Sequence, residues 1–346
     1  MHVLVTGATG FLGCFSVAAL HARGHTTRVL ARSQGKVERV LNARGERPRE
    51  IVVGDVTDPD VVAKALDGVD AVIHAAAVVA IEARRADEVE ATNVRAVELV
   101  IGGAHERGLG AIVHISSIGA LVTPGGPPVS QNSPLARPDN AYSRSKAEGE
   151  AFVRQLQQAG APIRTLYPVG ILGPDDPGLS ESNHTVRTFI RDAMVDTTGG
   201  MEISDVRDLA EIVARLVEPE SAPGRYVVGG FYLPWPELIA LMDELTGRRV
   251  RRMTVPGPLL RVIGNAADVV KRVVPFDFPL SREAMQLATQ WPGVVTSPNV
   301  EAMEIAFRDG RETYRETIRW LYETGHLTPE EAGLLAAADI GASASR

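Results

Sequence analysis

TGATGFLG, residues 6–13, places glycines at positions 7, 10 and 13 directly after a short apolar run. That run, HVLVT at 2–6, is typical of a buried strand, and Phe11 to Arg23 has the apolar spacing of a helix. Glycine lets a backbone turn tightly and lets a ligand approach without meeting a Cβ. A strand, a glycine turn and a helix N-terminus together favour anion binding, because the first-turn N–H groups have no partner inside the helix. We therefore expect a pyrophosphate at this turn.

The first 170 residues alternate short β-like runs with stretches of helical period. The helical stretches are Phe11–Arg23, Val61–Leu66 and Ala86–Arg107. Alternation of this kind predicts right-handed crossovers and a doubly wound parallel sheet, with the ligand outside the carboxyl ends of the strands. The expected strands are HVLVT (2–6), TRVLA (27–31), REIVVG (49–54), DAVIHA (70–75), AIVHIS (111–116) and IRTLYP (163–168).

The alternation ends near residue 217, which predicts an α/β chain of two parts. Residues 1–172 are expected to form a dinucleotide-binding Rossmann domain, to which 201–217 returns. A smaller, mostly helical substrate-binding region is expected from 173–200 and 218–335, followed by a flexible tail at 336–346. The first part of that region, GPDDPGLSESNHT (173–185), is rich in turn formers and is expected to be a mobile loop.

A helix is predicted over Leu259 to Val274, with an apolar side and a charged side. We expect it to pack on a core rather than to lie on a membrane surface. No apolar stretch approaches the ~20 residues of a membrane span, so no integral membrane segment is expected. The apolar side carries Leu259, Val262, Ile263, Ala266, Val269, Val270 and Val273.

Bulk properties narrow the class of partner and the compartment. A net charge of −7 over 346 residues argues against nucleic acid, so a small-molecule substrate is expected. The single cysteine, Cys14, cannot form an internal disulfide, which suits the reducing cytoplasm, and we expect it to be buried. The first strand is preceded by no charged and apolar leader typical of secretion.

A second motif, Tyr142-Ser-Arg-Ser-Lys146, has the form YxxxK, and Ser117 lies 25 residues before the tyrosine. With the glycine turn, these residues resemble the extended short-chain dehydrogenase/reductase superfamily. Within it, the chain is similar to the epimerase/dehydratase-like group and its dihydroflavonol reductase and 3β-hydroxysteroid dehydrogenase branch. Further matching segments are GDVTD (54–58), EATNVRAV (90–97), ISSIGAL (115–121), YPVGILGP (167–174) and SDVRDLA (204–210).

The resemblance implies roles for four residues. A lysine one helical turn after a tyrosine places an ammonium on the same face, and a nearby cation lowers the pKa of a phenol. Tyr142 is thus expected to be the proton donor or acceptor, with Lys146 tuning it and holding the nicotinamide ribose. Ser117 would bind the substrate oxygen; neighbouring strand residues face opposite sides, so only one of it and Ser116 can do so, and family alignment prefers Ser117. Asn93 would hold a relay water, or else simply cap or bridge within its helix.

The dinucleotide's identity depends on the end of the second strand. An acidic residue there would bind the adenosine ribose, but the chain has Arg32 and Ser33, which predict NADP(H). Arg32 could instead be a solvated charge, and NAD(H) stays possible. Asp55 is the expected adenine contact, although it could equally cap the following helix. The resemblance also assigns cofactor contacts to Gly7, Thr9, Gly10, Phe11, Leu12, Gly13, Val56, Ala75, Ala76, Ala77, Tyr142, Lys146 and Pro168.

No metal site is predicted. His74, at the end of the fourth strand, has no histidine or carboxylate partners at ligand spacing, and we expect it to be a packing residue near the cofactor. A homodimer is plausible through helices that would span 86–107 and 142–158, as relatives commonly pair there. Small and apolar surface would come from Ala147, Ala151 and Val153.

Together these features predict an NADP(H)-dependent oxidoreductase that interconverts a ketone or aldehyde and an alcohol, on a small lipophilic substrate. Two departures from the sugar-nucleotide members of the family support this prediction. Tyr167-Pro168 stands where many relatives have Arg-Pro, and Ala120-Leu121 stands where they often have a tyrosine. The alternatives are an NAD-dependent nucleotide-sugar epimerase and, more remotely, a non-catalytic protein that binds the dinucleotide.

Overall fold

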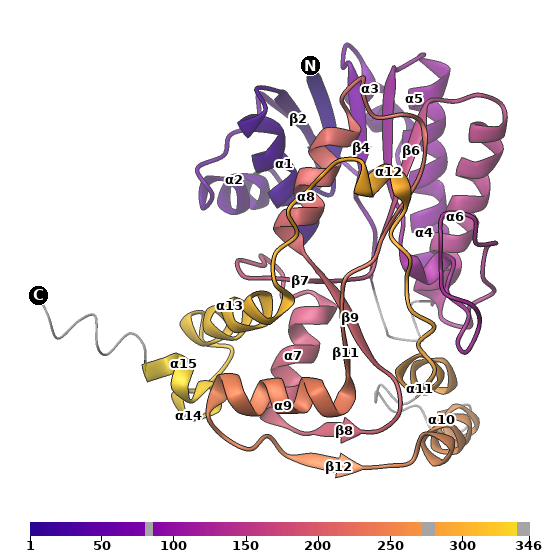
Figure 1. The fold of residues 1–346 in the computed structure, drawn as a ribbon. Coiled ribbons are helices and arrows are strands. Elements are labelled where there is room, and N and C mark those ends of the chain that lie inside the picture. The colour runs from indigo at the N-terminus through magenta and orange to yellow at the C-terminus, as the bar shows by residue number, and fades with distance from the viewer. Residues whose placement is uncertain (80–85, 272–280, 338–346) are drawn as a thin grey trace, which may run out of the picture.

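A seven-stranded parallel sheet forms the upper half of the molecule in Figure 1. The computed structural model describes residues 1–79, 86–271 and 281–337. The strand order is β3-β2-β1-β4-β5-β6-β10, and every neighbouring pair is parallel. The strands are β1 His2–Thr6, β2 Thr26–Ala31, β3 Glu50–Val53, β4 Ala71–His74, β5 Ala111–Ile115, β6 Ile163–Pro168 and β10 Gly224–Val228.

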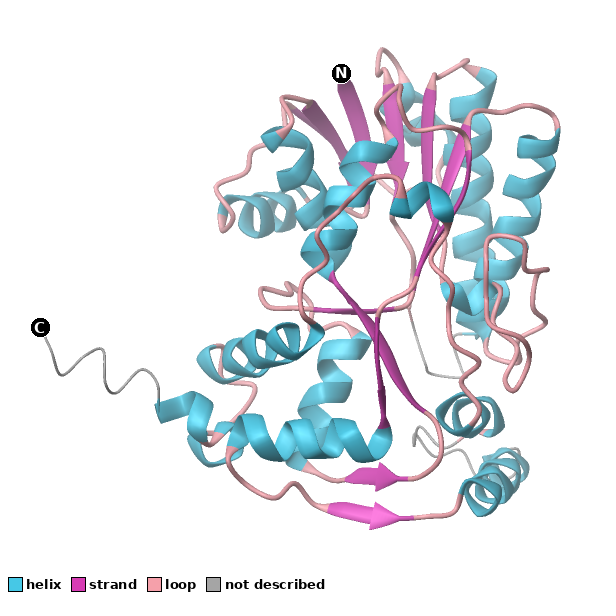
Figure 2. Cartoon of the chain, in the orientation of Figure 1, coloured by secondary structure: helices cyan, strands magenta, loops and turns pink. Residues whose placement is uncertain are grey.

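Helices cover both faces of this sheet, as Figure 2 shows. One face carries α1 Phe11–Ala22, α2 Gln34–Asn42 and α8 Val206–Leu216. The other carries α3 Pro59–Leu66, α4 Ala86–Val97 and α6 Ala141–Gln158; α4 continues through a π-helical turn, Glu98–Gly102, into α5 Gly103–Glu106. The predicted doubly wound α/β fold is confirmed, and the six strands expected in the first 170 residues are all present.

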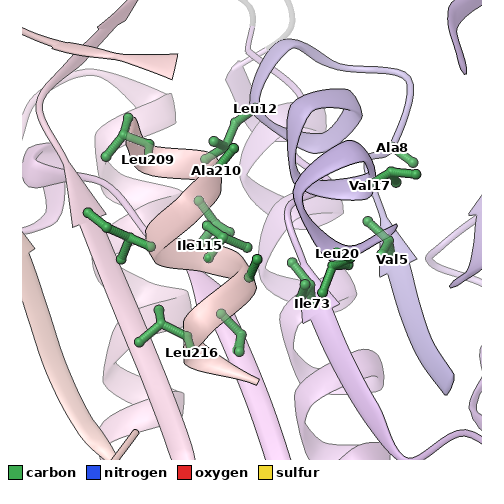
Figure 3. Packing of buried hydrophobic residues seen from close by; sticks show 14 of the residues in the cluster. Val5, Ala8, Leu12, Val17, Leu20, Ile73, Ile115, Leu209, Ala210 and Leu216 are labelled. Carbon is green, nitrogen blue, oxygen red and sulfur yellow. The ribbon is translucent and has the colours of Figure 1, made fainter. Parts of the chain in front are cut away.

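The alternation of side chains along the strands explains why both faces are covered. Val3 and Val5 of β1 join the core beneath α1 and α8, whereas Leu4 points into the core beneath α3 to α6. Figure 3 shows the first of these cores, where Leu20 of α1 and Leu216 of α8 pack over the sheet. A strand with apolar side chains on both faces is buried only in a sheet that has helices on both sides, and the apolar run at 3–5 predicts such a strand.

The lower half of the molecule is built on two small sheets (Figure 1). Its core lies between the three-stranded sheet and the helices α7, α9 and α13. The remaining elements are β7 Gly170–Leu172, α7 Glu181–Arg191, β8 Met194–Asp196, β9 Gly200–Asp205, β11 Phe231–Pro234, α9 Trp235–Thr246, β12 Arg252–Thr254, α10 Gly257–Lys271, α11 Arg282–Thr289, α12 Pro298–Glu301, α13 Gly310–Glu323, α14 Pro329–Ala332 and α15 Leu334–Ala337, with a 3-10 turn at Ile118–Ala120.

The chain crosses between the two halves more often than we expected. β10 falls within 218–335, the stretch expected to form the substrate-binding region, yet it pairs with β6 at the edge of the large sheet. Val300 of α12 packs into the same core as β10. Residues 201–217 were expected to return to the large sheet, and α8 does pack on it. β9, just before α8, instead pairs with β7 and β11 in the three-stranded sheet. The expected tail at 336–346 lies outside the described residues from 338 onwards.

The segment 173–185, expected to be a mobile loop, contains the first turn of α7. Asn183 is fully buried in that helix, and its side-chain amide donates to the Gly173 carbonyl (2.9 Å) and to the Asp176 carboxylate (3.1 Å). Asp176 also accepts from the main-chain N–H groups of Gly178 (3.0 Å) and Ser180 (2.6 Å). The polar residues that suggested a loop therefore bind one another and order the approach to the helix.

The predicted helix at 259–274 exists as α10, but its apolar side does not pack on a core. Leu259, Val262 and Ile263 are 51%, 61% and 37% exposed, whereas Gly264 is buried against α11. A Cβ at Gly264 would lie 2.8 Å from Met285, so α10 packs closely on α11 at this glycine. Leu260 is also buried, while the side expected to be apolar faces outward. The side chains of residues 269–280 lie outside the described part. No helix in that described part is long and apolar enough to cross a bilayer.

Candidate functional site

The glycine turn brings β1, β4 and α1 into close contact. Gly7 has a φ of 76°, and a Cβ there would lie 2.6 Å from the main chain of Ala75 and Ala76, directly after β4. A Cβ at Gly13 would lie 2.1 Å from the Gly7 carbonyl oxygen. These two glycines are thus required by packing of the backbone itself. Gly10 is different, since it is exposed and a Cβ there would meet only the Gly7 oxygen, at 3.3 Å.

The N-terminus of α1 is suited to a pyrophosphate. Gly10 is the residue before the helix; it offers no side-chain cap, and the first turn carries no acidic residue. The N–H groups of that first turn have no partner inside the helix, and no side chain caps them, so they can bind an anion. Thr9 is half-exposed beside it, whereas Phe11 and Leu12 are buried in the core. The residues present therefore fit a dinucleotide phosphate group.

The ends of β2 and β3 carry the residues predicted to bind adenosine. Arg32 is exposed, and Ser33 caps α2 by accepting from the Lys36 N–H (3.3 Å). Asp55 accepts from the N–H and hydroxyl of Thr57 (2.9 and 2.7 Å), and these bonds with the positive charge of Arg32 hold the pKa of its carboxyl below the usual value. The cap of the next helix is Asp58 rather than Asp55. Val56 follows in the same turn.

Ser117, Tyr142 and Lys146 come together at the carboxyl end of β5. Ser117 follows β5 and begins a 3-10 turn, where its hydroxyl accepts from the Gly119 N–H (3.1 Å). Tyr142 lies in the first turn of α6, with its phenol beside the Ser117 hydroxyl. The Lys146 Nζ lies 5.8 Å from the centre of the Tyr142 ring and donates to the Ile115 carbonyl (2.9 Å). Pro168 is the last residue of β6, the strand next to β5, and it is buried at the same carboxyl end of the sheet.

The charges at this cluster are set by burial. Burial raises the pKa of the Tyr142 phenol above its usual value, and the Ser117 hydroxyl opposes that rise. Burial also lowers the pKa of Lys146 to about 8, although the negative charge of Glu150 opposes it. An ammonium near a phenol favours the phenolate, which suits a tyrosine that transfers a proton.

Asn93 lies on α4 and bridges to the loop after β4. Its amide oxygen accepts from the Val78 N–H (2.8 Å), and its amide nitrogen donates to the Val78 carbonyl (3.0 Å) and the Ser145 hydroxyl (2.9 Å). Both N–H donors are therefore engaged by protein groups. The bridging role weighed for this residue is present, and the relay role stays a prediction.

His74 and His114 form a buried pair beneath Lys146. The rings are stacked with centroids 5.9 Å apart, and His74 Nδ1 is 2.8 Å from the Thr6 hydroxyl. Burial, with the charge of Lys146, lowers the pKa of His74 to about 3 and that of His114 well below its usual value. Both rings are thus neutral packing groups, as expected for His74. The described residues hold no cluster of potential metal ligands.

Two residues beside the cluster were not found from the sequence. Glu150 is completely buried one helical turn beyond Lys146, and it accepts a hydrogen bond from the Tyr167 hydroxyl of β6. Glu283 of α11 binds Asn140, the residue that caps the helix carrying Tyr142. The four-residue spacing from Lys146 to Glu150 was visible in the sequence; the second contact spans 143 positions and had no local signal.

Two of the three residues expected to form a homodimer surface do not lie on the surface of this chain. Ala147 and Val153 are 8% and 0% exposed and belong to the cores of this chain, so they offer no surface to a second copy. The reason is that α6 turns these residues toward the sheet. Of the three residues named for that surface, only Ala151 is partly exposed.

Comparison with known proteins adds a family and an activity class to this geometry. The model of the NAD dependent epimerase/dehydratase family matches residues 3–229. That match includes the glycine turn, Ser117, Tyr142 and Lys146, and it confirms the family resemblance based on the motifs. Dihydroflavonol reductase and 3β-hydroxysteroid dehydrogenase sequences are among the relatives, as the motifs indicated.

Two relatives and one solved structure are similar to most of the chain. The chain is 30% identical over 279 residues to sterol demethylase protein B of Methylococcus capsulatus, covering 79% of this chain and 83% of the relative. It is 27% identical to 4-hydroxy-2-methyl-3-oxo-4-farnesyl-3,4-dihydroquinoline-1-oxide ketoreductase of Stigmatella aurantiaca, covering 94% and 97%. The crystal structure of gox2253 superposes with a TM-score of 0.79 at 24% identity, covering 94% of this chain and 99% of that one.

Proposed function

Because the chain belongs to the NAD dependent epimerase/dehydratase family, we propose that it reduces a ketone or aldehyde, or oxidises the corresponding alcohol, with NADP(H). It is an NAD(P)-dependent enzyme of the extended short-chain dehydrogenase/reductase type. The observation that carries this proposal is the meeting of Ser117, Tyr142 and a buried Lys146 at the carboxyl end of the sheet. Ligands of doubly wound sheets bind at that edge. The glycine turn lies at the same edge, two strands away.

In the proposed reaction Tyr142 transfers the proton. A bound nicotinamide would supply or accept the hydride. In the direction of reduction, the Tyr142 hydroxyl donates its proton to the substrate oxygen as negative charge develops there. The Ser117 hydroxyl donates a hydrogen bond to the same oxygen, while its own oxygen is held by the Gly119 N–H. Lys146 stabilises the phenolate that remains.

The preference for NADP(H) rests on Arg32. No acidic side chain stands at the end of β2, where one would repel a 2′-phosphate. Arg32 is exposed at that position, and the N-terminus of α2 follows with Lys36 in its first turn. A guanidinium next to a helix N-terminus favours a dianionic phosphate.

The substrate is proposed to be small and lipophilic. Two named relatives act, by their names, on a sterol and on a farnesylated ring, and the substrate would reach a cluster lined by few charges. Ala120 and Leu121, where sugar-nucleotide members often have a tyrosine, are 0% and 4% exposed and pack in the core beside Tyr167. No polar group is thereby presented to a sugar, which favours a reductase over the alternative nucleotide-sugar epimerase.

We extend the proposal to compartment and assembly. The single Cys14 is buried and unpaired, which suits a reducing compartment, so we propose a cytoplasmic enzyme. We also propose a homodimer through the outward faces of α4 and α6, where Glu90 and Arg144 form an ion pair at 3.1 Å. With Ala147 and Val153 buried, such an interface would be largely polar.

Titration of the purified protein with NADPH and NADH tests the proposal before a substrate is known. Binding would be followed by nicotinamide fluorescence and by thermal stabilisation, because a ligand that binds only the folded state raises its stability. Tighter binding of NADPH supports the reductase. Preference for NADH, or nicotinamide already bound after purification, would favour the epimerase, and binding of neither would overturn the proposal.

A further inference from the structure

A line of four functional side chains runs along one side of α6. Tyr142, Lys146, Glu150 and Arg154 follow one another at intervals of four residues, which places them on the same face of the helix. The first two belong to the proposed reaction. The third is a carboxylate with no exposed area, and a carboxylate in that situation needs compensation from its surroundings.

The carboxylate of Glu150 is held from two directions. Its Oε1 accepts from the Tyr167 hydroxyl, on β6, and from the Arg154 Nε at 3.1 Å. Tyr167 is fully buried among apolar residues, so its hydroxyl has a single place to donate. The second oxygen, Oε2, has no hydrogen-bond partner among the described residues. Oε1 is thus held by two hydrogen bonds, whereas the negative charge at Oε2 can still attract a cation at longer range.

Lys146 is the cation one helical turn before Glu150 on the same face of α6. Its side chain is 7% exposed, and its one hydrogen bond to the described residues is to the neutral Ile115 carbonyl. Glu150 is the group that opposes the loss of the Lys146 proton caused by burial. A buried ammonium without a nearby negative charge would become neutral, and a neutral amine cannot stabilise a phenolate.

We propose that Glu150, held by Tyr167 and Arg154, is a positioning residue that keeps Lys146 protonated. This inference deepens the proposed function and rests on it. In this chain Tyr167, which stands where many relatives have an arginine, supplies a neutral donor to the carboxylate. Arg154 already forms an ion pair with the Glu150 Oε1. The neutral donor from Tyr167 adds no second cation beside it, so part of the carboxylate charge still acts on Lys146.

Other charged groups around the pair are few. The neutral rings of His74 on β4 and His114 on β5 face Lys146 from the sheet. Arg225 of β10 adds a weaker positive charge near Glu150, and burial raises the pKa of the Glu150 carboxyl while Tyr167 and Arg154 oppose that rise. On the α4 side, Glu90 is occupied by Arg144. Glu150 is therefore the one carboxylate in the described residues that is both buried and adjacent to Lys146.

The titration of Lys146 can be read directly, because the chain has only four lysines, Lys36, Lys64, Lys146 and Lys271. NMR of protein labelled with ¹³C-lysine would follow each ε-methylene against pH, and Lys146→Arg would assign the resonance. Glu150→Gln keeps both hydrogen bonds to Oε1 and removes the charge. For opposite charges ~6 Å apart at an effective dielectric of ~20, reduced by the ion pair of Glu150 with Arg154, the expected drop in the pKa of Lys146 is about one to two units.

Two further variants make the test specific. Tyr167→Phe removes the donor that stabilises the ionised carboxyl, so the pKa of Lys146 should fall between those of the wild type and Glu150→Gln. It also serves if Glu150→Gln fails to fold. Glu148→Gln removes an exposed carboxylate from the same helix and should leave the Lys146 titration unchanged.

An unchanged pKa of Lys146 in folded Glu150→Gln, or in Tyr167→Phe, would overturn the inference. Because this readout needs neither substrate nor cofactor, it is independent of the proposed reaction. Conversely, turnover that survives Tyr142→Phe would overturn the proposed function and leave the Lys146 titration as measured.

Discussion

Asn140 and Glu283 join α11 to the start of α6, the helix that carries Tyr142. The Glu283 carboxylate of α11 accepts from the main-chain N–H of Asn140 (2.7 Å) and from its side-chain amide (2.6 Å). Asn140 in turn caps α6 by accepting from the Ser143 N–H (2.7 Å). Tyr142 lies between Asn140 and Ser143 in the chain, so a shift of α11 would move the start of α6 and with it the Tyr142 phenol.

Loss of this contact should impair turnover more than cofactor binding. Glu283→Ala removes both acceptors at a partly exposed site, and we expect roughly a tenfold fall in kcat with an unchanged Kd for NADPH. Glu283→Gln retains one acceptor, so its kcat should lie between those of the wild type and Glu283→Ala. Stopped-flow turnover with parallel fluorescence titration would measure both quantities. Equal losses in kcat and in NADPH affinity would contradict this role.

Substitutions at Gly13 and Gly10 should separate folding from cofactor binding. In Gly13→Ala the new Cβ would lie 2.1 Å from the Gly7 oxygen, so the backbone must shift, at a cost of about 1–3 kcal/mol or more. In Gly10→Ala the same oxygen is 3.3 Å away, so folding should be retained while the phosphate surface is blocked. Thermal unfolding and NADPH titration distinguish the two outcomes. Gly110→Ala, where a Cβ meets nothing within 4 Å, is the control.

Arg32→Ala should weaken NADPH binding and leave NADH binding unchanged. A charge-assisted hydrogen bond contributes about 1.5–3 kcal/mol, which corresponds to a loss of roughly 10- to 100-fold in affinity. Arg39→Ala, an exposed arginine in the last turn of α2, should change neither. Equal weakening of NADPH and NADH in Arg32→Ala would show that this residue does not select the 2′-phosphate.

Acid should destabilise the protein through His74 and His114. Their pKa values are lowered in the folded state, to about 3 for His74, so between that value and ~6.5 the unfolded chain binds protons that the folded one does not. Stability should therefore fall as the pH drops below ~6.5, by about 1.4 kcal/mol per unit for each histidine.

Replacing His114 should remove about half of that dependence. Neither ring nitrogen of His114 has a partner among the described residues, so His114→Leu leaves no polar group unpaired. Urea unfolding at several pH values between 7 and 5 would measure the slope. The exposed His184→Leu is the matched control and should keep the full slope. A slope in His114→Leu equal to that of the wild type would refute this account.

The large sheet was predictable because its signals are local. An apolar run, a glycine turn and a helical period each lie within a few residues, and YxxxK places Lys146 and Tyr142 on one helical face whatever the rest of the chain does. Ser117 was chosen over its neighbour Ser116 through the family resemblance, because the local pattern places both residues at the end of β5. The glycine turn was expected from the sequence, whereas the close approach of Ala75 to Gly7 is a feature of the fold alone.

The remaining features depend on contacts between distant residues. β10 is a short strand whose choice of β6 as neighbour, rather than β11, follows from packing of Tyr226 and Val228 beneath α8 and α12. α7 begins within a stretch of turn formers because Asn183 and Asp176 bind each other. Likewise the outward apolar side of α10 follows from its close packing on Met285 through Gly264. None of these pairings has a local signature.

The most direct test of the central claim is the turnover of NADPH by wild-type protein and by Tyr142→Phe across a panel of lipophilic ketones and aldehydes. NADPH binding is measured alongside on both proteins. The account predicts that a wild-type substrate is found, that Tyr142→Phe binds NADPH as tightly, and that its kcat falls by about 10²–10⁴-fold, because the proton donor is lost. Turnover by Tyr142→Phe at the wild-type rate would contradict the assignment of Tyr142 as the acid.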